Sequence, residues 1–259
     1  NLLATSLALN AYMLSAEPKY REWLLGYVDA WRQRMIDNDG IIPTNIGLDG
    51  TIGGATDGKW YGGVYGWGFT VKVPQTGADA HRNTHHLGLT GFINAYMLTG
   101  KDEYLQCWRD QVAAVNSQGR KIDGTMQYPR MYGEKGWYAF SPSPYRHGVR
   151  QIYYLSMKES DRKMVGNDPW FDFLEGKNPG YAVSALRADL TRVRERVLGF
   201  RKDTTTPDTR LADDPMIYNP ASVKSLLQLM VGAIHPGHQG SVLHARLRYF
   251  DPVRRRAGI

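Results

Sequence analysis

The sequence NAYMLSAEPKY at residues 10–20 returns as NAYMLTGKDEY at residues 94–104, with six of the eleven positions identical. Apolar residues around each copy recur every three or four positions, which is the spacing of an amphipathic helix. Each copy passes through a short turn containing Pro or Gly into a second amphipathic segment. The repeat therefore predicts two helical hairpins that bury their apolar faces against each other.

A weaker third copy is predicted at residues 170–197, where LEGK is similar to the LTGK of the second copy. Equivalent points in the first two copies lie 84 residues apart. This period is longer than the roughly 34–47 residues of common helical repeats. The additional residues form long loops, such as residues 40–79, between the hairpins.

The loop at residues 40–79 is rich in Gly and aromatic residues rather than in Ser and charge. Long loops without secondary structure of their own are usually functional or disordered, and this composition argues against disorder. Aromatic faces in such a loop could stack on sugars, or the loop could simply pack on itself. The candidate substrate-binding aromatic residues are Trp60, Tyr61, Tyr65 and Trp67.

Helical hairpins with aromatic, Gly-rich loops resemble the six-hairpin (α/α) toroid superfamily, which includes many glycoside hydrolases and polysaccharide lyases. The resemblance covers roughly residues 1–200 and rests on the NAYML repeats, the GKWYGGVYGWGF loop, the NTHH helix start and the FLEGKNPG turn. It implies an all-α fold, an incomplete (α/α) toroid over residues 1–203. Residues 204–259 are then a connector, a short helix and the start of a β-rich region, because LHARLRYF alternates apolar and polar residues.

Composition places the chain among globular proteins, since 42% of its 259 residues are hydrophobic and 22% are charged. No apolar run approaches the ~20 residues needed to cross a bilayer. The chain starts at Asn1 inside a helical pattern, without Met or a signal peptide, so we expect it to be a piece of a longer protein. Its single cysteine, Cys107, excludes an internal disulfide and a Cys-rich zinc site, and we expect it to be buried in a helix.

The formal net charge of +7 favours an anionic partner. Many of the basic residues lie in the segments 187–202 and 246–256, which are also consistent with ordinary solvated surfaces. No zinc-finger, RNP-like or helix-turn-helix pattern indicates nucleic acid. We therefore expect the partner to be a polysaccharide or oligosaccharide, most simply an acidic one, and we expect no membrane span. The expected location is extracellular or periplasmic, where such polymers are degraded.

The stretch GADAHRNTHHLGL at residues 77–89 leads into the second repeat. Asn83 is expected to be the N-cap of the helix. His85 and His86 take the positions that Asn1 and Leu2 hold in the first copy, so the scaffold itself does not require histidine there. The pair is either a set of satisfied structural histidines or part of a functional site.

A metal site is a further alternative at this stretch, with His81, Asp79 or His147 as a third ligand. Adjacent histidines point to different faces of a helix and rarely chelate one ion, and HEXXH is absent. We therefore expect neither a metal nor another cofactor.

A second cluster lies in GWYAFSPSPYRHGVRQIYYLSM at residues 136–157, where Tyr145, Arg146 and His147 follow two prolines. A phenol, a guanidinium and an imidazole together offer a base, a carboxylate clamp and a charge stabiliser. The alternative is a loop whose charged surface has no chemical role.

Elimination from a uronic acid would use both clusters. The proton at C5 becomes acidic only when the neighbouring carboxylate is neutralised, and the departing O4 needs an acid. The resemblance to toroid lyases implies that Asn83 with His85 or His86 neutralises the carboxylate. It implies Tyr145 as base or acid, with Arg146 or His147 in support. Tyr61, Tyr65 and Tyr138 are alternative candidates for the base or acid. Arg82 is a candidate substrate-binding residue.

Two other functions remain open from the sequence. A glycoside hydrolase of the same architecture needs two carboxylates, and Asp57 and Asp79 are the best candidates, although Asp-Gly is also an ordinary turn. The other loop carboxylates are Asp49, Asp123 and Glu134. A non-catalytic carbohydrate-binding or scaffold module is the third hypothesis, since degenerate repeats make good binding surfaces.

Overall fold

The computed structural model describes residues 2–72 and 77–202 of the chain. The chain divides into two compact units, which are described separately. The first unit comprises residues 1–71 and 80–164, and the second comprises residues 72–79 and 165–259. The connector, short helix and β-rich region expected for residues 204–259 lie outside the described residues.

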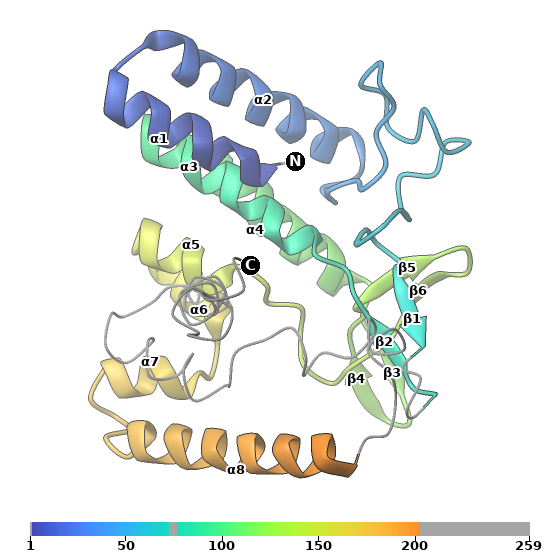
Figure 1. The fold of residues 1–259 in the computed structure, drawn as a ribbon, viewed down its shortest axis with the longest axis vertical. Coiled ribbons are helices and arrows are strands. Elements are labelled where there is room, and N and C mark those ends of the chain that lie inside the picture. Colours follow the sequence, from blue (N-terminus) through green and yellow to red (C-terminus); the bar gives the residue numbers. More distant parts are fainter. Residues whose placement is uncertain (1, 73–76, 203–259) are drawn as a thin grey trace, which may run out of the picture. The chain divides into compact units, whose positions relative to one another are not determined.

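Figure 1 labels the elements along the chain. The α-helices are α1 (Thr5–Ser15), α2 (Pro18–Asp37), α3 (Leu89–Thr99), α4 (Glu103–Ser117), α5 (Val149–Ser156), α6 (Glu159–Val165), α7 (Pro169–Leu174) and α8 (Tyr181–Lys202). Two 3-10 helices are η1 (Leu2–Ala4) and η2 (His85–Gly88). The strands are β1 (Thr70–Lys72), β2 (Asp79–His81), β3 (Arg120–Ile122), β4 (Thr125–Gln127), β5 (Met131–Gly133) and β6 (Gly136–Tyr138).

Both repeats fold as helical hairpins, as the sequence predicts. Helix α1 packs against α2, α3 packs against α4, and α3 also packs against α1 and α2 (Figure 1). The interior between these helices holds Leu24, Phe92, Leu105 and Trp108, all completely buried. Burial of such large apolar side chains contributes roughly 1.5–3 kcal/mol each. The pairing of the two hairpins is therefore an ordinary hydrophobic core.

The first helix of the first repeat ends in a specific turn. Ala16 has a left-handed backbone, with φ 57°, and its N–H donates to the carbonyl of Tyr12. The hydroxyl of Ser15 accepts the N–H of Glu17 at 3.2 Å. These bonds satisfy backbone groups that the end of a helix would otherwise leave unpaired.

The second repeat ends its first helix with the same bonds. Gly100 has φ 69°, and its N–H donates to the carbonyl of Tyr96. The hydroxyl of Thr99 accepts the N–H of Lys101 at 3.2 Å. The two turns explain why the repeat has Tyr and Ser or Thr at matching positions. The Tyr carbonyl and the Ser or Thr hydroxyl accept the hydrogen bonds that form each turn.

A third helix end of this kind follows α5. Met157 has φ 52° and donates its N–H to the carbonyl of Tyr153. The hydroxyl of Ser156 accepts the N–H of Lys158 at 3.2 Å. The third copy of the motif is therefore QIYYLSMKESD at residues 151–161.

The predicted third copy at residues 170–197 does contain two helices, α7 and α8, but the end of α7 makes different hydrogen bonds. Gly176, which matches Gly100 of LTGK, has a left-handed backbone with φ 76°, but its N–H donates to the carbonyl of Phe173, three residues back. Glu175 stands where the other copies have Ser or Thr, so no hydroxyl is available to accept the next N–H. The similarity of LEGK to LTGK therefore indicates a left-handed helix end without the full motif, which needs a Tyr followed three residues later by Ser or Thr.

An ion pair attaches the third copy to the second. The guanidinium of Arg109 in α4 donates through Nε and Nη2 to the two carboxylate oxygens of Asp161, at 2.8 and 2.9 Å. Asp161 is completely buried, and Ser156 also donates to it. Arg109 lowers the pKa of Asp161 against the opposing effect of burial. This two-pronged geometry fixes α6 against α4.

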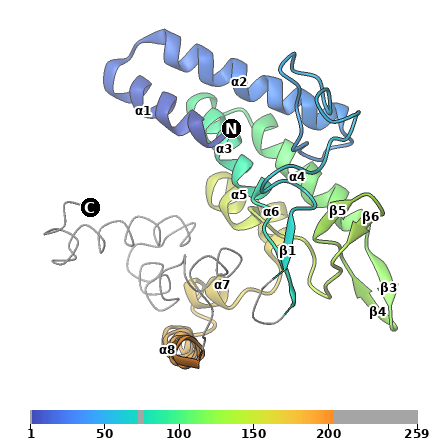
Figure 2. The ribbon, with the colours of Figure 1, turned by 45° about the vertical axis from the view of Figure 1, so that its right-hand side comes forward.

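The expectation of an all-α toroid is wrong. The described residues contain three two-stranded sheets beside the helices, so the fold is mixed. Strands β3 and β4 form an antiparallel hairpin, as do β5 and β6, and both follow α4 (Figure 2). Asp123 and Gly124 both have positive φ in the first of these hairpins. Asp-Gly between two short segments of alternating residues indicates a β-hairpin. The helical repeat led to an all-α prediction that did not use this signal.

The second unit holds a small aromatic cluster. Asp168 caps α7 by accepting the N–H of Trp170 at 3.0 Å. The ring of Trp170 contacts those of Phe173 and Tyr181, with each pair of ring centroids 5.7 Å apart. Helix α7 therefore packs against the start of α8 through aromatic rings.

The repeated helix end yields a reciprocal test. Gly100→Ala should lower the free energy of unfolding by about 1 kcal/mol, because alanine resists the left-handed backbone and no neighbouring atom crowds the position. Ala16→Gly should raise it by a somewhat smaller amount for the same reason. Urea denaturation of the full chain measures both. A change of the same sign in the two variants would contradict this interpretation.

Candidate functional site

The two histidines begin the second repeat in a 3-10 turn instead of an α-helix. Helix η2 starts at His85, and its N-cap residue is Thr84, which makes no side-chain capping bond. The expectation that Asn83 is the N-cap is therefore wrong. Its amide instead donates to the carbonyl of Arg130 at 3.3 Å and contacts the sulfur of Met131 at 3.1 Å. Asn83 holds the start of η2 against β5.

His85 joins the two clusters that the sequence singled out. Its Nε2 lies 2.8 Å from the hydroxyl of Tyr145, which is 60 residues away in the sequence. Only 7% of His85 and 1% of Tyr145 are exposed. The indole of Trp67 stacks on the imidazole, with ring centroids 3.7 Å apart. The NTHH and YRH motifs therefore meet in a single buried contact.

Gln111 in α4 determines the direction of the hydrogen bonds at this contact. Its side-chain oxygen accepts the backbone N–H of Ile42 at 2.9 Å. Its side-chain nitrogen must then face the hydroxyl of Tyr145, 3.2 Å away, and donate to it. The hydroxyl gives its own proton to Nε2 of His85, the other group within reach. A neutral His85 consequently carries its proton on Nδ1.

Burial controls the protonation of both partners. It lowers the pKa of His85 well below 6.5, and the nearby His86 and His147 act in the same direction. Burial also raises the pKa of Tyr145. At neutral pH, His85 is therefore an uncharged imidazole and Tyr145 keeps its proton, as the hydrogen-bond directions require.

A second layer of the site is accessible to solvent. The imidazole of His86 stacks on that of His147, with centroids 4.8 Å apart and planes 19° apart. The ring of Tyr145 lies 5.0 Å from that of His147. His86 is half-buried, whereas Arg146 and His147 are exposed. The structure thus brings four of the six predicted catalytic residues into contact, His85, His86, Tyr145 and His147, and Arg146 lies between the last two in the chain.

Helix α4 holds the segment that carries this second layer. The amide of Asn116 bonds both backbone groups of Tyr145, donating to its carbonyl at 3.0 Å and accepting its N–H at 2.7 Å. The indole of Trp108 donates to the carbonyl of His147 at 2.8 Å. Three bonds to one helix fix the backbone on both sides of Arg146. The positions of these side chains are therefore determined by α4.

The sequence analysis missed Gln111 and Asn116. Gln111 lies four residues after Cys107 and four before Val115, both buried on α4, and is itself completely buried. A polar residue on the apolar face of a helix needs a buried hydrogen-bond partner. The position of Gln111 on that face could therefore have identified it as part of a buried polar contact. Nothing comparable marks Asn116 in the sequence.

Three aromatic residues of the long loop, Trp60, Tyr61 and Trp67, contact the β5–β6 hairpin. Trp60 lies 4.5 Å from Tyr132 and 6.5 Å from Trp137, measured between ring centroids. Trp67 is completely buried and donates its indole N–H to the carbonyl of Ile42 at 2.9 Å. The prediction that Trp67 stacks on a sugar is therefore wrong, because its faces are occupied. Tyr65 is 54% exposed.

Other predicted residues lie outside the His–Tyr contact. Tyr138 shares hydrogen bonds with Thr70 and the carbonyl of Gly68, at 3.1 and 3.2 Å. Tyr61 contacts the ring of Tyr132 in the aromatic cluster. Arg82 is half-buried. The partners of Tyr138 and Tyr61 are therefore residues other than His85 and Tyr145.

The two carboxylates of the hydrolase hypothesis are both exposed. Asp57 lies in a turn with φ 53°, which is consistent with its Asp-Gly sequence. Asp79 forms an ion pair with Lys72 at 2.5 Å in the second unit. Of the other loop carboxylates, Glu134 pairs with Lys59 and Asp49 with Thr51. These interactions are those of ordinary surface carboxylates.

Cys107 is buried, as expected from its place in the α4 pattern. Burial raises the pKa of its thiol to about 11, so the thiol stays protonated and unreactive at neutral pH. Within residues 2–72 and 77–202, no group of three or more His, Cys, Asp and Glu side chains is arranged to hold a metal ion. Over the same residues, no helix has the length and apolar character needed to span a membrane.

Comparison with known proteins gives one match. Residues 1–128 match the model of a family described as a domain of unknown function (DUF8034). The matched region contains both helical hairpins and His85, but it ends before Tyr145. No curated protein and no solved structure matches the chain. The comparisons therefore add no activity to what the site itself indicates.

The depressed pKa of His85 predicts a pH dependence of stability. Below pH 6.5 an unfolded histidine takes up a proton that the folded His85 refuses, so the free energy of unfolding should decrease as the pH falls from 6.5 towards the lower folded pKa. The slope from one such group is at most about 1.4 kcal/mol per pH unit. Urea denaturation at several pH values measures it.

His85→Gln is the informative variant for this slope. It should flatten the pH dependence, even if it also lowers stability by breaking the bond to Tyr145. His81→Gln, which replaces an exposed histidine on β2, is the matched control and should retain the slope. An unchanged slope in His85→Gln would show that other groups cause the acid sensitivity.

Proposed function

We propose that this chain forms part of a carbohydrate-active enzyme that cleaves a uronic-acid-containing glycan by β-elimination. The observation that carries the proposal is the 2.8 Å contact between His85 and Tyr145. It joins two sequence motifs whose residue types suit this reaction, and His147, two residues after Tyr145, stacks on His86. We further propose that the protein acts outside the cytoplasm, where such polymers occur.

The reaction breaks two bonds in the sugar. A base removes the proton at C5, the electron pair forms the C4–C5 double bond, and the oxygen at C4 departs with a proton from an acid. The adjacent carboxylate must be neutralised, because negative charge spreads onto it as the C5 proton leaves. The site therefore needs a cation or donors and one or two groups that transfer protons.

The accessible layer of the site supplies these groups. Arg146 is exposed and permanently charged, so it is suited to pair with the carboxylate of the sugar. His86 and His147 are suited to the proton transfers, because each neutral imidazole has one nitrogen that donates a proton and one that accepts a proton. Their stacked rings lie 4.8 Å apart, so both can reach one sugar ring.

The buried layer takes a positioning role in this proposal. Tyr145 is 1% exposed and its hydroxyl is bonded to both His85 and Gln111. It is therefore better placed to hold its neighbours than to act as the base that the toroid resemblance implied. Asn83 likewise bonds β5 instead of a substrate. The reactive groups are therefore Arg146, His86 and His147, while Tyr145, Asn83 and His85 hold the site in place.

The net charge of +7 supports an acidic substrate. The exposed ring of Tyr65 offers a surface on which a sugar could stack. No comparable arrangement supports the hydrolase hypothesis, since Asp57 lies in an exposed turn and Asp79 is paired with Lys72.

The test uses the full-length protein with polygalacturonate, alginate, hyaluronan and neutral glucans. Elimination should produce new reducing ends together with the ultraviolet absorbance of an unsaturated uronate. His147→Gln and His86→Gln should each lower the rate at least about 100-fold, the usual contribution of a proton-transferring group. Unfolding midpoints verify that both variants remain folded.

His81→Gln is the matched control, since it changes an exposed histidine outside the cluster. Its rate should stay within about twofold of the parent, a change below the level of a lost catalytic group. New reducing ends without absorbance would mean hydrolysis and would contradict elimination. A protein that cleaves none of these polymers, or full activity in both cluster variants, would also reject the proposal.

A further inference from the structure

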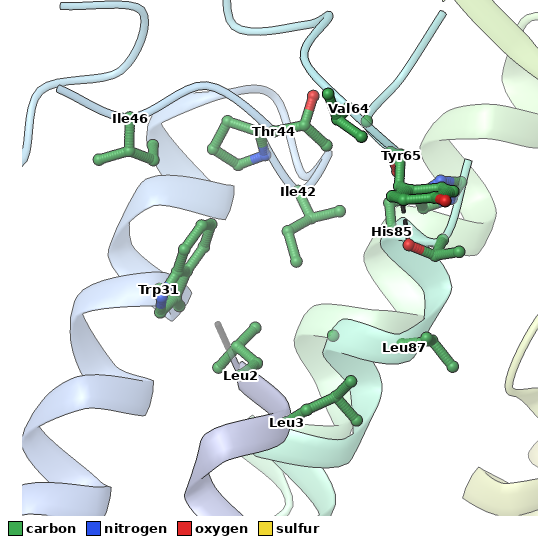
Figure 3. A pocket seen from close by; sticks show the side chains of 14 residues that line it. Leu2, Leu3, Trp31, Ile42, Thr44, Ile46, Val64, Tyr65, His85 and Leu87 are labelled. Atoms are coloured by element: carbon green, nitrogen blue, oxygen red, sulfur yellow. Dashed lines mark hydrogen bonds between the residues drawn. The ribbon is translucent and has the colours of Figure 1, made fainter. Parts of the chain in front are cut away.

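A pocket of about 420 Å³ lies next to His85, and all its lining residues belong to the first unit. Its walls come from η1, α2, the long loop and the start of the second repeat. Figure 3 shows Trp31 of α2 on one side and His85 with Tyr65 on the other, with Ile42 between them. The pocket is large enough for a small organic molecule.

Six of the fourteen residues that line the pocket are Leu, Ile or Val. The aliphatic lining residues are Leu2, Leu3, Ile42, Ile46, Val64 and Leu87. Among the described residues that line the pocket, there is no Asp, Glu, Lys or Arg. A charged ligand would lose its hydration here without gaining a partner of opposite charge, so the composition favours an uncharged and largely apolar ligand.

The hydroxyl of Thr44 on this wall is already used by the fold. It donates to the carbonyl of Gly62 at 3.1 Å and accepts the N–H of Trp67 at 3.2 Å. Thr84 donates to the carbonyl of Tyr65 at 3.5 Å. These bonds leave the threonine hydroxyls with little capacity to recognise a ligand.

Two buried nitrogens on the lining residues remain unsatisfied. Nδ1 of His85 and Nε1 of Trp31 make no hydrogen bond to any residue that the structure describes. An indole nitrogen can only donate. Nδ1 of His85 is also a donor, because Gln111 and Tyr145 leave the proton of the imidazole on that atom. A buried donor without a partner destabilises the folded protein until an acceptor reaches it.

We propose that this pocket binds a small, uncharged, largely apolar molecule whose carbonyl oxygen accepts a hydrogen bond from His85 or Trp31. The aliphatic wall accommodates the body of the ligand. The two N–H groups select for an acceptor, and the lack of charged lining residues selects against a carboxylate. The inference rests on the pocket and its donors, and it stands whether or not the protein cleaves glycans.

Both nitrogens are covered by neighbouring side chains in the structure. A ligand oxygen therefore reaches either one after a side-chain rotation, which is a common change on binding. Tyr65 lines the same pocket and has a left-handed backbone, with φ 61°, which disfavours its present conformation. Movement of Tyr65 is the simplest route to the donor of His85.

Benzophenone and diphenylmethane are matched probes for the full-length protein, because they differ in a carbonyl oxygen and share two phenyl rings. Titrations followed by ¹H–¹⁵N NMR should give roughly fivefold to tenfold tighter binding of benzophenone, as one net hydrogen bond provides. The side-chain N–H signal of Trp31 or His85 should shift with benzophenone. Trp31→Phe assigns the indole signal.

Val64→Trp tests the location of binding. Val64 is 75% exposed on the pocket wall, so an indole there can fill the pocket without disturbing the core, and benzophenone binding should be lost. Leu48→Trp adds the same side chain to the same loop at an exposed position outside the lining, and it should bind normally. Photo-crosslinking by benzophenone itself should label lining residues.

Equal affinity for the two probes would overturn the role of the N–H donors. Normal binding by Val64→Trp would overturn the location, as would crosslinks confined to other surfaces. Absence of benzophenone binding would reject the proposal altogether. None of these outcomes affects the glycan assay, whose critical residues are His86 and His147, so the two proposals fail separately.

Discussion

The buried amide of Gln111 is the interaction on which the candidate site depends. A side chain that is completely buried must satisfy both ends of its amide, and Gln111 does so with the backbone of Ile42 and the hydroxyl of Tyr145. One residue of α4 thereby fixes the start of the long loop and the segment before α5. Through Tyr145 it also fixes the ring orientation and the proton position of His85.

Helix α4 makes side-chain hydrogen bonds to several other segments of the chain. Asn116 holds the backbone of Tyr145, Trp108 holds that of His147, and Arg109 holds α6 through Asp161. The second repeat is therefore more than a scaffold copy of the first. Its second helix, α4, makes the polar contacts that position the third copy and the backbone of His147, while its apolar residues contribute to the core.

Buried and exposed polar side chains lie next to each other at the His85 contact. Burial keeps His85 neutral and Tyr145 protonated, so both act through hydrogen bonds of fixed direction. Arg146 and His147, one and two residues after Tyr145, are exposed to solvent. This arrangement holds the backbone of the exposed side chains firmly without desolvating them, which the proposed proton transfers would require.

The sequence by itself determined the two helical hairpins, because the 3.6-residue period and the repeated NAYML segment are local properties of the chain. It also indicated the two motifs of the candidate site. The repeat does not require histidine at positions 85 and 86, and Tyr145, Arg146 and His147 combine a phenol, a guanidinium and an imidazole. Only the tertiary structure decided that the fold is mixed, that Trp67 is a core residue and that His85 meets Tyr145. These features depend on contacts between residues far apart in the chain. Local periodicity carries no information about such pairs, so a buried polar residue such as Gln111 reveals its role only when its partners are in place.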